Sequence, residues 1–268
     1  MIKTFCVAHK ALEFDLPEDA TVIWLGNDTP ATRNCDNILV ASEYAPDIHI
    51  KHEYLGGAAG SFIAEKFLIE NPTTWKQTDL VSIIQYRKFI SPIPVGRPAR
   101  NYHGMYLFNE VEANIIDIDA MQYQMEGDFL ISTPAGVGGV LAQYSQWHSG
   151  PDLLRYIAFA LEFEIINRDD LLDFFSGAFI IPGGIEFGIF PIPIYLDVIA
   201  KLRRICFEFL KIHKPASNDP YQQRALAFCN ERLGGYLLIK QLKSIYPGEI
   251  FDRFFGYMHC LSDNDIYK

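Results

Sequence analysis

The apolar run Leu80-Val81-Ser82-Ile83-Ile84 ends abruptly in polar residues, and this is the feature that most constrains the fold. A short, β-branched run with polar ends predicts a buried strand. It is followed by Gln85-Tyr86-Arg87-Lys88, and from Leu80 to Asn109 there is no Asp or Glu, although 33 acidic side chains outnumber 23 basic ones overall. Ligands of open α/β sheets bind beyond the carboxyl ends of strands. We therefore expect a phosphorylated ligand near Tyr86 and Arg87.

Strand-like and helix-like segments alternate through the first two thirds of the chain, which favours an α/β sheet flanked by helices. The last quarter is predicted to be nearly all helix, and the Pro/Gly-rich stretch 91–104 is predicted to be a long functional loop. Strands are predicted at 4–8, 21–25, 80–84, 128–132 and 178–181, and helices at 58–70, 152–164, 169–175, 193–213 and 220–243.

Length and charge narrow the class of protein. A chain of 268 residues predicts one large domain, or one domain with a subdomain. The net charge of −10 argues against a nucleic-acid partner, because phosphates require a broad basic face, but it permits a local basic pocket. The five cysteines have no CxxC or zinc-ribbon spacing, and no signal peptide is recognisable. We therefore expect a reduced, cytoplasmic protein.

The stretch 178–200 is very apolar, but its first half contains several glycines and prolines together with Glu186. These residues break helices, so the stretch is not predicted to span a membrane. We expect instead that the segment 182–193 forms an exposed apolar lip, which can contact a lipid-linked acceptor or the inner face of a membrane.

Polar residues follow each of the first two predicted strands. His9 and Lys10 come directly after the first strand, so in a parallel sheet they lie at the ligand edge beside Arg87. The alternative is a solvated surface turn. Asp36 and Asn37 follow the second strand and can hydrogen-bond a ribose or a base, although an Asx turn explains them equally well.

The segment 56–61, Gly-Gly-Ala-Ala-Gly-Ser, precedes a predicted helix. It is neither a Walker loop nor a GxGxxG fingerprint. The amino end of the helix can hold an anion through its free N–H groups. We favour the other explanation, in which the small residues form a tight turn and allow close helix packing.

Two motifs suggest metals on spacing alone. Asp117-Ile118-Asp119 matches the DxD pattern that binds a metal–nucleotide in many glycosyltransferases, but it precedes a short helical pattern, so an N-cap role fits better. His49 and His52 have no further ligand near them in the sequence, so zinc is not predicted.

Candidate bases lie in the second half of the chain. His148 and Asp152 flank a turn that opens a helix, where Asp152 can interact with the helix dipole or both side chains can face a sugar. Glu231 shares a helix face with small residues, and Arg224 two turns before it is a candidate partner. We favour a buried ion pair of Glu231 and Arg232; the functional alternative is a general base that deprotonates an acceptor hydroxyl.

Several of these segments, in this order, resemble a bacterial family of domains of unknown function, classed as glycosyltransferases, from capsular, exopolysaccharide and lipopolysaccharide gene clusters. The similar segments are Ala8-His9-Lys10, Asp36-Asn37-Ile38, Gln85-Tyr86-Arg87-Lys88-Phe89, Tyr144 to His148 with Asp152, Tyr221-Gln222-Gln223-Arg224 and Glu231-Arg232-Leu233. The chain departs from the family at Gln85, where the family has histidine, and after Gly60, where the Glu-Leu-Thr helix start is missing.

The resemblance spans nearly the whole chain and implies a GT-A-like, Rossmann-type mixed sheet flanked by helices. It implies a single domain, 1–268, with a nucleotide-binding α/β part at 1–185 and a helical C-terminal part at 186–268. The residues implied at the donor are His9, Lys10, Asp36, Asn37, Tyr86, Arg87 and Lys88, and the catalytic candidates are Glu231, Asp152 and His148.

In the GT-A fold a DxD motif normally follows the strand that we place at 80–84. Here the corresponding residues are Gln85-Tyr86-Arg87-Lys88, so we infer that cationic side chains replace the metal. Arg87 can form two parallel hydrogen bonds with a diphosphate and stabilise charge on the leaving group. No cofactor and no bound metal are expected, with Mg²⁺ or Mn²⁺ as the alternative.

The resulting hypothesis is a transferase that moves a sugar from a nucleotide-diphosphate donor to a glycan or lipid-linked acceptor in surface polysaccharide biosynthesis. The rival hypothesis is a non-catalytic protein that binds carbohydrate or a partner on a degenerate transferase scaffold. The replacement at Gln85 and the lack of a DxD after the strand motivate this rival.

Overall fold

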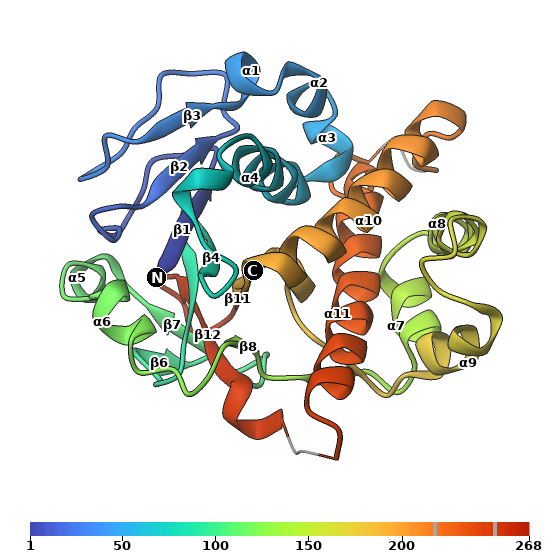
Figure 1. Cartoon of the computed structure of the whole chain (residues 1–268). Helices are drawn as coiled ribbons and strands as arrows, with labels where there is room; N and C mark the ends of the chain where they lie inside the picture. Colours follow the sequence, from blue (N-terminus) through green and yellow to red (C-terminus); the bar gives the residue numbers. More distant parts are fainter. Residues whose placement is uncertain (217–218, 249–250, 268) are drawn as a thin grey trace.

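The centre of the structure is a mixed ten-stranded sheet that contains strands from both ends of the chain. A computed structural model describes residues 1–216, 219–248 and 251–267. The strand order is β3-β2-β1-β4-β5-β12-β7-β6, with β11 paired to β4 and β8 paired to β12 (Figure 1). A separate two-stranded sheet is formed by β9 and β10.

The strands are β1 (Ile2–Ala8), β2 (Thr21–Trp24), β3 (Ile38–Val40), β4 (Leu80–Gln85), β5 (Lys88–Ser91), β6 (Arg97–Pro98), β7 (Met105–Phe108), β8 (Ile131–Ser132), β9 (Ala135–Gly136), β10 (Phe179–Ile180), β11 (Gly188–Pro191) and β12 (Phe255–Leu261). The α-helices are α1 (Ala41–Tyr44), α2 (Pro46–His49), α3 (His52–Leu55), α4 (Ala58–Glu70), α5 (Glu110–Ala113), α6 (Ile118–Gln122), α7 (Val140–Trp147), α8 (Gly150–Glu162), α9 (Arg168–Ser176), α10 (Ile192–Ile212) and α11 (Ala225–Ile245). Short 3₁₀ turns lie at Pro72–Thr74, Gly184–Glu186, Gln222–Arg224 and Phe251–Phe254.

The first four strands of the sheet order run parallel, so their carboxyl ends share one edge. β1 pairs in parallel with β2 and β4, and β2 pairs in parallel with β3. The register places Ala8 opposite Trp24 and Val7 opposite Gln85. The residues that follow Ala8 and Gln85 are therefore brought together at this carboxyl edge, as the sequence predicts.

Apolar cores cover both faces of this parallel part because strand side chains alternate. Phe5 and Val7 of β1 belong to the larger core, which extends to α4, α10 and α11, whereas Cys6 and Ala8 face a second core. The helices α7, α8 and α9 lie on the side of α11 away from the sheet (Figure 1). The result is a mixed α/β architecture with a sheet flanked by helices.

Local sequence explains the helix boundaries. Asn167 accepts a hydrogen bond from the N–H of Asp170, whose carboxylate accepts one from the N–H of Asn167, and this capping box starts α9. Pro193 lies at the first helical positions of α10, where no intrahelical N–H bond is lost. Asp219 accepts bonds from the N–H groups of Tyr221 and Gln222, so it caps a 3₁₀ turn that leads into α11.

Two expectations about the last third are corrected. The segment 182–193 is no exposed lip: Ile185, Ile189 and Phe190 are buried, and β11 pairs with β4 inside the sheet. After α11 the chain also returns to the sheet as β12, which pairs with β5 and β7, so the last quarter is not nearly all helix. The apolar residues of the segment 182–193 are part of the core.

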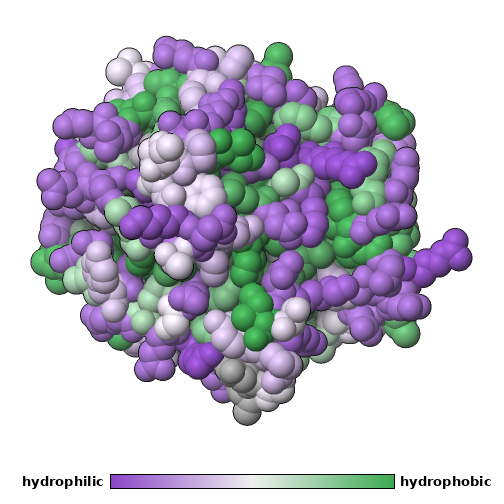
Figure 2. Space-filling model, viewed as in Figure 1, coloured by the Kyte–Doolittle hydropathy of each residue, from purple (hydrophilic) through white to green (hydrophobic). Residues whose placement is uncertain are grey.

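Within the described residues, no helix has both the length and the apolar character that crossing a bilayer requires. The face shown in Figure 2 is dominated by hydrophilic residues, with hydrophobic ones in smaller patches between them. The five cysteines are free thiols, and all of them are buried.

Candidate active site

His9 and Tyr86 meet at the carboxyl edge of the sheet. Their ring centroids lie 4.7 Å apart in an edge-to-face arrangement. The N–H of Tyr86 donates a 3.0 Å hydrogen bond to the carbonyl of Val7, so the backbone pairing of β1 and β4 continues to the edge. Two motifs that are far apart in the sequence thus form one surface.

Tyr86 and Arg87 form a tight turn, because Lys88 pairs with Gln85 as β5 reverses direction. The carbonyl of Arg87 accepts a 2.9 Å bond from the N–H of Leu261, which fixes this turn to the end of β12. The guanidinium of Arg87 lies 5.9 Å from the centre of the Tyr86 ring. The sequence predicted the end of β4 but not the hairpin that presents Arg87.

Arg224 reaches the same edge from the start of α11. The pKa of His9 is lowered by partial burial and, in decreasing order, by the positive charges of Lys10, Arg224 and Arg87. Gly56 leaves the space for Arg224, since a Cβ at this position would lie 3.4 Å from the Cδ of Arg224. The charges of Lys10, which adjoins His9, and of Arg87 and Arg224, which come from two distant segments, therefore act on one imidazole.

Two further histidines extend this surface along α2 and α3. The ring of His52 lies 6.4 Å from that of His9 and 6.5 Å from that of His49. His49 Nε2 is 3.2 Å from the carbonyl oxygen of Leu25 at the end of β2. Burial lowers the pKa of His52 to about 4, with smaller contributions from His9, His49 and Arg224. With their lowered pKa values, the imidazoles of His9 and His52 are neutral near pH 7 and can gain protons beside an anion.

We call these residues the cationic edge: His9, Lys10, His52, Tyr86, Arg87 and Arg224. Its chemistry suits an anion such as a diphosphate, because guanidinium groups bind two phosphate oxygens at once and imidazoles donate hydrogen bonds. The sequence did not predict His52 at this site, and it made Arg224 a candidate partner of Glu231. The signal for Arg224 was its place in the Tyr-Gln-x-Arg segment before the helix.

Lys88, which the sequence placed at the donor, is engaged elsewhere. Its Nζ donates a 2.6 Å hydrogen bond to the hydroxyl of Tyr267 and lies 4.8 Å from the centre of that ring. It sits opposite Cys260 in the pairing of β5 with β12. Lys88 therefore ties the end of the chain to the sheet.

Asp36 and Asn37 lie at the opposite end of the strands from the cationic edge. They directly precede β3, whose Ile38 pairs with Val22 near the start of β2. The carbonyl of Asn37 accepts a 2.8 Å bond from the N–H of Val22. Because β3 runs parallel to β2 and β1, the structure separates these two residues from His9 and Arg87.

The three catalytic candidates differ in accessibility. Asp152 is fully buried, and its oxygens pair with Arg155 at 3.3 Å and with the N–H of Ala216 at 3.0 Å. It fastens α8 to the segment after α10, and a buried carboxylate with these partners cannot reach a substrate. His148 stacks on Phe228 with centroids 3.9 Å apart, and burial lowers its pKa.

Glu231 is partly exposed and is held from two sides. One carboxylate oxygen accepts a 2.8 Å hydrogen bond from the N–H of Gly183, and the other pairs with Arg232. The expected ion pair with Arg232 is therefore present, whereas the guanidinium of Arg224 lies 4.9 Å from the centre of the Tyr221 ring. The side chain of Glu231 keeps 26% of its surface exposed, so further lone pairs remain accessible.

The DxD pattern forms a helix start. The carboxylate of Asp117 accepts a 2.9 Å bond from the N–H of Ala120, which caps α6 as expected. Asp117 and Asp119 also line a cavity of about 360 Å³ together with Asp15 and Glu18. Among residues 1–216, 219–248 and 251–267, no group of three or more His, Cys, Asp or Glu side chains has a geometry that could hold a metal ion.

The fold matches a solved structure described as the apo form of WbbM, a bifunctional glycosyltransferase. The match has a TM-score of 0.70 at 13% sequence identity, and it covers 98% of this chain and 45% of that chain. This chain thus spans less than half the length of the protein it matches. No protein-family model and no curated protein matches the sequence, so membership in the bacterial family stays a prediction. The likeness shows that the chain shares its mixed α/β fold with part of that structure.

Proposed function

We propose that the chain is a glycosyltransferase that takes a sugar from a nucleotide-diphosphate donor and transfers it to a glycan or lipid-linked acceptor. The observation that carries this proposal is the convergence of Lys10, Arg87 and Arg224 around His9 at the carboxyl edge of a parallel sheet. Anionic ligands of such sheets bind at this edge. The fold match to a glycosyltransferase supports the proposed sugar transfer.

In this proposal the cationic edge holds the pyrophosphate of the donor. Arg87 and Arg224 neutralise the charge that builds on the leaving diphosphate as the bond to the sugar breaks. His9 and Tyr86 present ring faces and polar atoms beside them, and they orient the nucleotide. These cationic groups supply the charge stabilisation that a DxD-bound divalent ion gives in other transferases.

Glu231 is the base that we propose for a reaction that inverts the anomeric carbon. It lies seven residues after Arg224, which is about two helical turns and about 10 Å along α11. The N–H of Gly183 and the guanidinium of Arg232 fix its orientation, which a general base requires. The acceptor hydroxyl would lose its proton to Glu231 as its oxygen attacks the sugar.

From the motif resemblance we propose that this activity serves the biosynthesis of a surface polysaccharide such as capsule or lipopolysaccharide, on the cytoplasmic side of the membrane. The test is transfer or donor hydrolysis with uridine, guanosine and cytidine diphosphate sugars, with and without EDTA. We expect activity that persists in EDTA. Activity that EDTA abolishes and Mg²⁺ or Mn²⁺ restores would overturn the metal-free part.

One observation favours a second candidate, a non-catalytic protein that binds carbohydrate or a partner. Asp152 is buried and both oxygens of Glu231 already have protein partners, so each candidate base also has a structural role. Calorimetry with nucleoside diphosphates separates the two candidates. A chain that binds none of them is not a transferase of the proposed kind.

A further inference from the structure

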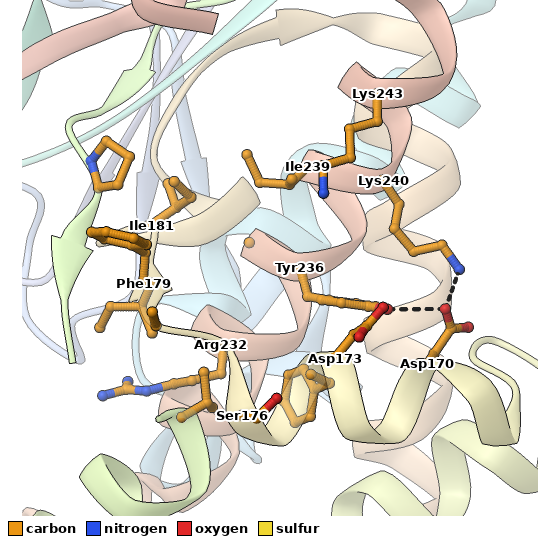
Figure 3. Close-up of a pocket in the computed structure, with 17 residues that line it drawn as sticks. Asp170, Asp173, Ser176, Phe179, Ile181, Arg232, Tyr236, Ile239, Lys240 and Lys243 are labelled. Atoms are coloured by element: carbon orange, nitrogen blue, oxygen red, sulfur yellow. Dashed lines mark hydrogen bonds and ion pairs between the residues drawn. The ribbon is translucent and has the colours of Figure 1, made fainter. Parts of the chain in front are cut away.

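A second site lies on the other side of α11, where a cavity of about 830 Å³ opens between α9, α11 and β10 (Figure 3). This volume is in the range of sites that bind small molecules, and it exceeds what a single hexose ring fills. Figure 3 shows Asp170, Asp173 and Ser176 of α9 facing Tyr236 and Lys240 of α11, with Phe179 and Ile181 on the remaining side.

One wall of the cavity is apolar and carries an aromatic ring that is open to solvent. Phe179 keeps 65% of its surface exposed, although a phenylalanine is usually buried. It is continuous with Ile181, which packs against Gly235. Elsewhere in the lining, Phe174 and Tyr236 lie edge to face with centroids 5.5 Å apart. The exposed ring of Phe179 offers a flat apolar surface to a ligand.

The opposite wall carries charges that largely balance. Asp170 accepts hydrogen bonds from the hydroxyl of Tyr236 at 2.9 Å and from Nζ of Lys240 at 2.6 Å. Asp173 and Lys243 add one carboxylate and one ammonium group to the lining. The lining also contains Arg232, whose charge is paired with Glu231, so the remaining charged groups are two carboxylates and two ammonium groups. Donors and acceptors are thus both present. This pattern fits a neutral ligand with many hydroxyl groups better than a phosphate or a lipid headgroup.

The cavity reaches the proposed base through consecutive residues of α11. Arg232 lines its inner end and pairs with Glu231, which faces the direction of Arg224 two turns earlier. Adjacent helical residues point about 100° apart. Glu231 itself does not line the cavity, so the Arg232–Glu231 ion pair is the contact that connects a ligand in the cavity with the proposed base.

We propose that this cavity binds the neutral saccharide chain of the acceptor, with a sugar ring stacked on Phe179 and hydroxyl groups bound by Asp173 and the Asp170–Lys240 pair. A sugar ring combines an apolar C–H face with polar hydroxyls, which matches the two walls. The inference rests on the proposed transferase function. It identifies the acceptor as an oligosaccharide that the protein recognises over more than one ring.

The experiment uses the full chain and saturation-transfer NMR with neutral linear trisaccharides of glucose, galactose, mannose and rhamnose. The variants are Phe179→Ala and Asp173→Ala, with Tyr123→Ala as the matched control, because Tyr123 is 73% exposed at the C-cap of α6 and does not line the cavity. We expect at least one trisaccharide to bind, about tenfold more weakly or worse in Phe179→Ala, and unchanged in Tyr123→Ala. In transfer assays, Phe179→Ala should raise the KM for acceptor and leave the KM for donor unchanged.

Nucleoside diphosphate binding is measured on the same samples, so that the two proposals can fail separately. If nucleotides bind but no trisaccharide does, or if the Phe179 and Asp173 variants bind as the wild type does, the saccharide site is overturned and the transferase function stands. If trisaccharides bind at the cavity but nucleotides do not bind, the transferase function falls. Displacement of trisaccharides by vesicles that contain a lipid phosphate would also contradict a neutral-saccharide site.

Discussion

The imidazole of His9 and the phenol ring of Tyr86 lie edge to face, with centroids 4.7 Å apart, at the carboxyl ends of the neighbouring strands β1 and β4. The parallel register of β1 and β4 produces this contact, because Val7 pairs with Gln85. Arg87 and Arg224 join the pair from a hairpin turn and from the start of α11. The binding of nucleoside diphosphates is expected to depend on this convergence.

Removing either guanidinium of the cationic edge should weaken binding of nucleoside diphosphates. A hydrogen bond to a charged group contributes about 1.5–3 kcal/mol, so Arg87→Ala and Arg224→Ala should each weaken binding by about tenfold to a hundredfold. Arg87→Lys should recover only part of the loss, because an ammonium group cannot bind two oxygens in parallel. Isothermal titration calorimetry measures these changes.

Arg100 provides the matched control for the arginine variants. It lies in the same stretch without carboxylates, but its side chain is 78% exposed and pairs with Asp265 at 3.0 Å. Arg100→Ala should leave nucleotide binding unchanged. Equal losses in Arg87→Ala and Arg100→Ala would mean that only the general positive charge of this stretch matters.

Nucleotide binding should take up protons. In the free protein the pKa values of His9 and His52 are lowered, that of His52 to about 4, so both rings are neutral near pH 7. A diphosphate beside them favours the imidazolium form and raises both pKa values. Affinity should therefore increase as the pH falls from about 7 towards 5. Titrations at pH 6 in buffers with different ionisation enthalpies measure the proton uptake, and a heat of binding that does not depend on the buffer would contradict it.

Substitutions of Asp152 and Glu231 should have different effects. Asp152 is buried with two partners, so Asp152→Asn should lower the free energy of unfolding by about 1.5–3 kcal/mol and leave kcat of the folded enzyme nearly unchanged. Glu231→Gln should lower kcat by about 10²–10⁴-fold, the usual contribution of a general base, while nucleotides still bind. Chemical unfolding and steady-state kinetics distinguish these outcomes. Wild-type turnover in Glu231→Gln would exclude it as the base.

Gly60 should be intolerant of any side chain. A Cβ at this position would lie 2.4 Å from both γ-carbons of Val7, so α4 would have to move away from β1. Gly60→Ala should cost about 1–3 kcal/mol in stability, as overpacking of a core does. Gly57→Ala is the control, because its Cβ meets only Nε2 of Gln85 at 3.4 Å. Equal melting temperatures of the two variants would show that α4 does not approach β1 this closely.

The sequence predicted those elements whose signal is local. The bounds of α4 are those expected, and β1, β2, β4, α8, α9 and α10 lie within a few residues of prediction, because each has its own apolar period and its own ends. The glycine segment also behaves as expected: Gly56 has φ +53° in a tight turn, and Gly60 allows close packing.

Strands stabilised by distant partners were not predictable in the same way. β5 and β7 are short and border a Pro/Gly-rich stretch that resembles a loop, and both pair with β12, which is far away in the sequence. The same limit applied to the site. His9, Tyr86 and Arg87 were found because they follow parallel strands, whereas Arg224 and His52 reach the edge through helix packing, and Asp36 and Asn37 lie at the other end of their strand.

The central claim is that the cationic edge holds the diphosphate of the donor. The most direct measurement is a crystal structure of the chain soaked with uridine, guanosine or cytidine diphosphate. We predict phosphate oxygens within hydrogen-bond distance of the guanidinium groups of Arg87 and Arg224, beside His9. A diphosphate bound elsewhere, for example through a metal ion at Asp117 and Asp119, would contradict the account.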